Sequence, residues 1–100
     1  MAKNIEITLG NGEYVVEKDY KDGFDASLVI DKYTDYFEPF DYIFGDFSYD
    51  KLRLKGFYNH DNPNRLPIND IDGLDNYIKN HCAYQCRYFL LKKKQKSQEK

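Results

Sequence analysis

The sequence has little of what marks secreted, membrane-spanning or disulfide-bonded proteins. It holds only two cysteines in 100 residues, too few for a disulfide framework, and a chain of this length can bury a core without one. No stretch approaches the roughly 20 apolar residues of a membrane helix. Residues 1–7 also lack the basic and apolar regions of a secretion signal. These absences predict a cytoplasmic protein with no membrane segment.

The sequence also lacks the common catalytic and cofactor-binding motifs. It has no phosphate-binding glycine loop, nucleophile elbow, zinc-protease helix or dinucleotide fingerprint. Acidic residues are numerous, but Asp41 and Asp46 would point to opposite faces of an expected strand, so they do not suit joint acid and base catalysis. We therefore expect a non-catalytic protein without a cofactor, with an enzyme as the lesser alternative.

Charge is distributed unevenly along the chain. Residues 1–50 carry twelve acidic residues and four lysines, a net charge of −8, whereas residues 51–100 carry five acidic and eleven basic residues, a net charge of +6. Such an asymmetry can hold two halves of one fold together, or it can leave a basic face for a partner. The pattern alone leaves both readings open.

Hydrophobic periodicity predicts one α+β domain over residues 1–92 in the order β-β-α-β-β-α-β. Short connections favour a largely antiparallel sheet, and we expect both helices to pack on its core face. Residues 93–100 are expected to form a disordered basic tail. The expected strands are 5–9, 14–16, 41–47, 51–57 and 87–92, and the expected helices are 25–36 and 72–82.

The first strands should form a hairpin with Asn-Gly at its turn, which places Ile7 opposite Val16 and Glu6 opposite Glu17. Asp25 is the expected N-cap of the first helix. Leu28, Val29, Tyr33 and Phe37 are expected to form the packed stripe of that helix, and Asp72 to cap the second helix.

The second hairpin carries the sharpest functional signal, because its two faces differ. A two-residue loop sets the register and places Asp46 opposite Arg53. Small and aliphatic residues share the expected core face: Ile43, Gly45, Phe47, Leu52, Leu54 and Gly56. Gly45 and Gly56 could let a helix approach closely. Cations and rings share the other face, and the expected ligand-binding residues are Tyr42, Phe44, Asp46, Lys51, Arg53, Lys55 and Phe57.

Cations beside exposed rings suit single-stranded RNA, because rings stack on bases and cations contact phosphates. RNA or a ribonucleoprotein is therefore the leading expected partner. A protein partner on the same face is the main alternative. A purely structural alternative is a two-sided sheet whose rings pack under the N-terminal hairpin or a loop. The sequence pI of 5.6 argues against a strong RNA binder.

Three residues near the end of the chain, with one from the loop before the second helix, allow a weaker, metal-binding interpretation. Cys82 and Cys86, with His81 and His60, could supply four ligands to zinc, although their spacing is atypical. Buried thiols in the second helix and the last strand are the preferred interpretation, and a redox pair is a further alternative.

The run DYIFGDFSYDKLRLKGFY, residues 41–58, resembles the signature of the YutD-like family of small bacterial proteins from Firmicutes. The resemblance extends to EYVVEKDYKDGF at residues 13–24, and to Cys82 and Cys86 followed by RYFLLKK. It covers nearly all of residues 13–94. The family is uncharacterised, so the resemblance implies a fold without implying an activity.

Overall fold

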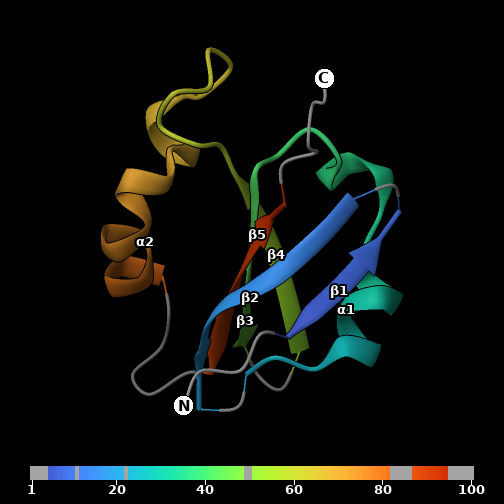
Figure 1. The fold of residues 1–100 in the computed structure, drawn as a ribbon. Coiled ribbons are helices and arrows are strands. Elements are labelled where there is room, and N and C mark those ends of the chain that lie inside the picture. Colours follow the sequence, from blue (N-terminus) through green and yellow to red (C-terminus); the bar gives the residue numbers. More distant parts are fainter. Residues whose placement is uncertain (1–4, 11, 22, 49–50, 82–86, 95–100) are drawn as a thin grey trace.

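The computed structural model describes residues 5–10, 12–21, 23–48, 51–81 and 87–94, and these form an α+β fold in the predicted element order (Figure 1). Neither α-helix in these ranges is long and apolar enough to cross a membrane. The strands are β1 (Glu6–Leu9), β2 (Gly12–Tyr20), β3 (Tyr42–Ser48), β4 (Lys51–Phe57) and β5 (Tyr88–Lys93). The α-helices are α1 (Ala26–Lys32) and α2 (Leu74–His81).

The five strands form one antiparallel sheet in the order β1-β2-β5-β3-β4. The last strand of the sequence therefore lies in the middle, between the two hairpins. Phe89 and Leu91 are fully buried on one face, and Leu90 is 3% exposed on the other. Burial of apolar side chains on both faces is typical of a central strand.

The β3–β4 hairpin has the predicted register, with Asp46 opposite Arg53. The β1–β2 hairpin does not, because Ile7 lies opposite Tyr14 and Glu6 opposite Val15. Its loop begins one residue earlier than expected, at Gly10, whose φ of 59° supplies the positive angle that the turn needs. The shift of two residues keeps the faces as predicted and removes the expected pairing of two glutamates.

Helix α1 begins where predicted and ends earlier. The Asp25 carboxylate accepts a hydrogen bond from the Leu28 N–H at 3.3 Å, which caps the first turn. The helix ends at Lys32 instead of near Tyr36, because Tyr33 is already extended, with φ −64° and ψ 139°. A short 3-10 turn, Asp35–Phe37, follows. Two β-branched residues in a seven-residue helix leave little intrinsic propensity to continue it.

The sheet carries a core on each face, and the two helices lie on opposite sides of it (Figure 1). The expectation that both helices share one face is therefore wrong. Val29 of α1 is fully buried in the first core, whereas Leu28, expected beside it, is 42% exposed. The first core contains Ile7, Leu9, Tyr14, Val29, Phe37, Phe40, Ile43, Leu52, Phe89 and Leu91. The second contains Phe44, Phe57, Leu74 and Leu90, with Tyr42, Ile71, Tyr77, Ile78 and Tyr88 packed against it.

Two glycines on the first face make room for aromatic rings. A Cβ atom at Gly45 would overlap the ring of Phe89, and one at Gly56 would overlap the ring of Phe40. The close approach expected at these positions therefore occurs, but it is made by side chains of β5 and of the segment before β3, and not by a helix.

The end of β5 extends past the expected domain boundary. Lys93 belongs to the strand, and the Lys94 N–H donates to the Glu13 carbonyl at 2.7 Å. The Lys94 ammonium lies 3.4 Å from a Glu6 carboxylate oxygen. Lys93 and Lys94, which we expected in the tail, are therefore bonded to the sheet, and residues 95–100 lie outside the described residues.

Candidate functional site

Helix α2 covers the face of the β3–β4 hairpin that carries the expected binding residues. Phe44 and Phe57 are each 1% exposed beneath it. The ring of Tyr77 from α2 packs edge-on against both, with centroids 5.6 and 5.7 Å away. The expectation that these two rings face solvent is therefore wrong. They gain more by burial against the apolar stripe of α2 than they would as an exposed platform.

Tyr42 is also partly covered, at the other rim of α2. It lines a second hollow in which three acidic residues, Glu17, Asp72 and Asp75, outnumber the one cation, Lys18. Burial is the main cause that raises the pKa of Tyr42, and the nearby Glu17 carboxylate adds to it. This side of α2 is therefore separated from the cations of β4.

The three cations of β4 remain at the surface, on the outermost strand of the sheet. Lys51 is exposed, the Arg53 side chain is 48% exposed, and Lys55 is half-buried. An open hollow of about 250 Å³, here called the cationic hollow, lies between β4 and α2. It is lined by Phe44, Asp46, Arg53, Leu54, Lys55 and Tyr77. The structure thus brings four of the seven expected residues together, and Tyr42, Lys51 and Phe57 lie outside this lining.

Asp46 and Arg53 form a two-pronged ion pair across β3 and β4. Arg53 donates from Nε to Oδ1 at 3.0 Å and from Nη2 to Oδ2 at 2.7 Å. Asp46 is only 2% exposed, so this is a partly buried pair and not a surface contact. The hydrogen bonds with Asp46 are the main cause that raises the pKa of Arg53. The pair forms one fixed, nearly neutral wall of the cationic hollow.

Lys55 differs from Arg53 because no carboxylate within the described ranges pairs with it. Its ammonium lies over the rings of Phe57 and Tyr77, 5.1 and 5.5 Å from their centroids. Burial lowers the pKa of Lys55, because removing water disfavours the charged form. Ring faces offset part of this cost, as in other cation–π contacts.

Leu54 and Tyr77 are the two residues of the hollow that the sequence did not single out for function, and Tyr77 is the one that contacts Lys55. Its spacing from Leu74 predicts a packed stripe, and the structure confirms that it packs in the second core. Burial raises its pKa, with the Asp46 charge as a smaller cause. Only the position of α2 over β4 reveals its place beside Lys55, and no local pattern encodes that position.

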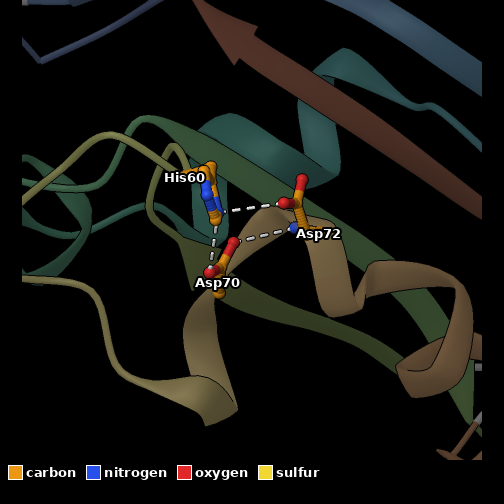
Figure 2. A group of neighbouring side chains, drawn as sticks. All are labelled: His60, Asp70 and Asp72. Carbon is orange, nitrogen blue, oxygen red and sulfur yellow. Dashed lines mark hydrogen bonds and ion pairs between the residues drawn. The ribbon is translucent and has the colours of Figure 1, made fainter.

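A second polar cluster holds the loop between β4 and α2 (Figure 2). His60 Nδ1 lies 2.9 Å from an Asp72 carboxylate oxygen and 3.3 Å from Asp70 Oδ2. Asp70 also accepts the Asp72 N–H at 2.9 Å and Arg65 Nε at 3.1 Å. The Asp72 N–H is the main cause that lowers the pKa of Asp70, and His60 and Arg65 act in the same direction. Asp70 caps the short 3-10 turn Ile71–Gly73 that leads into α2, whereas Asp72, the expected cap of the helix, lies within this turn.

His60, Asp70 and Asp72 have the donor atoms of a metal site, all within 4.8 Å of one another. The two Asp70 oxygens are, however, already engaged by Arg65 and by the Asp72 backbone N–H, and a bound cation would have to displace or repel the guanidinium. The cluster is better explained as a brace for the loop. The zinc set expected from His60, His81, Cys82 and Cys86 is not tested, because both cysteines lie outside the described residues.

The braced loop presents two large apolar side chains at its tip. Leu66 is 58% exposed and Ile68 is 71% exposed. Asn69 closes the turn between them, accepting the Leu66 N–H at 2.7 Å through its side chain and donating its own N–H to the Leu66 carbonyl at 2.9 Å. This segment, residues 65–68 and here called the loop tip, belongs to the loop between β4 and α2, which extends beyond the end of the sheet (Figure 1).

Comparison with known proteins agrees with the resemblance seen at residues 41–58. A family model described as "Putative antitoxin YutD-like" matches residues 8–92. "Putative antitoxin YutD" from Bacillus subtilis is 38% identical over 87 residues, which span 87% of this chain and 96% of that protein. A solution NMR structure of protein yutD from B. subtilis has a TM-score of 0.78 at 37% identity, covering 95% of this chain and 86% of that one. The chain therefore belongs to the YutD-like family.

Proposed function

We propose that this protein is a non-catalytic binding module whose partner is another protein. The observation that carries the proposal is the loop tip, where Leu66 and Ile68 are exposed on a turn held by hydrogen bonds. Apolar side chains that project from a surface are suited to filling a pocket on a partner. A braced loop also loses little conformational entropy on binding, which favours affinity.

RNA contact, the leading expectation from the sequence, has less support. Phe44 and Phe57 are buried and cannot stack on bases without displacing α2. Asp46 neutralises most of the charge that Arg53 would offer to a phosphate. The remaining cations could still attract a nucleic acid weakly, so nuclease sensitivity is part of the test.

The name of the B. subtilis relative fits a module that acts by binding. It is called a putative antitoxin, and an antitoxin acts against a toxin. Carried over to this chain, the name makes a toxin the proposed class of partner.

The test is capture of a partner by the tagged protein from a nuclease-treated lysate of B. subtilis, with and without a double substitution of the tip. Leu66→Ser with Ile68→Ser should abolish capture while the far-ultraviolet circular dichroism stays unchanged. The matched control is Leu28→Ser with Ile30→Ser, which removes the same two residue types at the same spacing from the exposed side of α1.

The proposal is supported if one protein is captured by the wild type and by the α1 control, and lost from the tip variant. Equal capture by all three proteins would contradict it, because the tip would then have no role. Loss of the partner on nuclease treatment, or capture of no protein at all, would also contradict it.

A further inference from the structure

We infer that the cationic hollow binds one carboxylate side chain of the protein partner, with the Lys55 ammonium as its counter-ion and Tyr77 as one wall. The inference rests on the proposed function for the identity of the partner. It adds the chemical group that the partner must present and the residue that recognises it.

The position of Lys55 is the first support. A lysine on an edge strand can reach water freely, yet this one lies half-buried over the rings of Phe57 and Tyr77. Holding an ammonium there costs hydration, and burial lowers its pKa. Within the described residues no carboxylate offsets that cost. An arriving carboxylate would provide the missing charge in a site that is already partly dry, where an ion pair is stronger than in water.

The charge of the hollow is the second support. Asp46 contributes one negative charge, Arg53 and Lys55 one positive charge each, and Phe44, Leu54 and Tyr77 none. The lining therefore carries a net charge of +1, which one carboxylate balances. A phosphate monoester carries about −1.5 to −2 at neutral pH and would leave excess negative charge close to the buried Asp46.

The Asp46–Arg53 pair gives the hollow its selectivity for a single anion. Because both Asp46 oxygens accept hydrogen bonds from Arg53, the pair is fixed in place and adds almost no net charge, so the Lys55 ammonium is the charge left for one anion. Its fixed geometry also keeps Arg53 from folding over Lys55. The shape and charge of the site are thus set before a ligand arrives, which lowers the cost of binding.

The test is an NMR titration of the full chain with the capped peptide acetyl-Gly-Glu-Gly-amide, following the Lys55 ε-methylene and Tyr77 ring signals. The glutamine version of the peptide and inorganic phosphate are titrated separately. We expect weak, saturable shifts at both groups with the glutamate peptide alone. Lys55→Met should weaken binding by roughly tenfold or more, Lys55→Arg should retain it, and Lys79→Met should leave it unchanged.

Lys79→Met is the matched control because Lys79 is exposed on α2 and its loss changes the net charge by the same amount. Equal affinity in Lys55→Met and the wild type would overturn the inference. So would tighter binding of inorganic phosphate, or equal shifts with the glutamine peptide. If Lys55→Met does not fold, its loss of binding is not informative, and Lys55→Arg becomes the deciding variant. Failure of folded Lys55→Arg to bind the glutamate peptide would then overturn the inference.

The two proposals can fail separately. The peptide titration needs no natural partner, so specific peptide binding with no captured protein would remove the proposed function and leave the carboxylate site. Capture that depends on the loop tip, together with no peptide binding, would remove the carboxylate site and leave the proposed function.

Discussion

Replacing Arg53 with methionine should destabilise the protein by about 2 kcal/mol, because it leaves the buried Asp46 carboxylate without its guanidinium. Removing one member of a fully buried ion pair costs roughly 3–5 kcal/mol, and an exposed pair is worth only about 0.2–1 kcal/mol. Asp46 is 2% exposed but the Arg53 side chain is 48% exposed. Water can therefore reach part of the space that Arg53 leaves, which places the cost between these limits.

Substitution of the other partner, Asp46, should lower the free energy of unfolding by less than Arg53→Met does. This difference between the two partners is the sharper test. Asp46→Asn leaves a guanidinium that is already half in water, and the amide oxygen can still accept one hydrogen bond, so we expect about 1 kcal/mol. The double variant should lose less stability than the sum of the two single variants, because with Asp46→Asn in place Arg53→Met no longer leaves a buried carboxylate without a partner. A coupling energy above about 1 kcal/mol would fit a partly buried pair.

Urea unfolding followed by circular dichroism measures these free energies. With a typical slope of about 1–3 kcal/mol per molar urea, Arg53→Met should lower the midpoint by about 1 M, and the melting temperature should fall by about 10 °C. A cost below about 0.5 kcal/mol for Arg53→Met would refute the reasoning, as would an equal or larger cost for Asp46→Asn.

Three further changes test other parts of the structure. Gly45→Ala should cost about 3 kcal/mol or prevent folding, because its Cβ would overlap the Phe89 ring; a urea midpoint equal to the wild type would contradict this. The lowered pKa of Asp70 means that its stabilising contribution is complete above its unfolded pKa of about 3.9 and is lost as pH falls through the lower folded value. The stability difference between wild type and Asp70→Asn, measured by urea unfolding from pH 7 to 2, should therefore narrow below about pH 4, whereas a constant difference would exclude this role. Asp25→Ala should cost about 1 kcal/mol by removing the cap of α1, and hydrogen exchange should rise first at the Leu28 amide; unchanged exchange there would argue against the cap.

The β3–β4 hairpin was predictable because two independent signals agree on it. Alternating residues define its faces, and only one register fits both those faces and a two-residue loop between Ser48 and Lys51. The β1–β2 register was not predictable in the same way. A two-residue loop could consist of residues 10–11 or of residues 11–12, and each choice contains a glycine, Gly10 or Gly12, that tolerates a positive φ. The local sequence does not decide between them, and in the structure Gly10 has the positive φ.

The position of α2 could not be read from the hairpin alone. Phe44 and Phe57 share a face of the hairpin with Asp46, Arg53 and Lys55. The local sequence of such a face fits partial exposure to solvent as well as it fits burial under another element. The apolar stripe of α2 has to be matched to one of two sheet faces, and that choice depends on tertiary packing. The cluster of His60 with Asp70 and Asp72 was also missed, because these residues are joined by an irregular loop without a period.

The central place of β5 governs the order in which the molecule can assemble. Each hairpin consists of local contacts and can form soon after its residues leave the ribosome. The strand that joins them comes last, so β2 and β3 each expose an unpaired edge until residues 88–93 emerge. Joining of the sheet, and with it completion of both cores, must therefore wait until residues 88–93 have been synthesised.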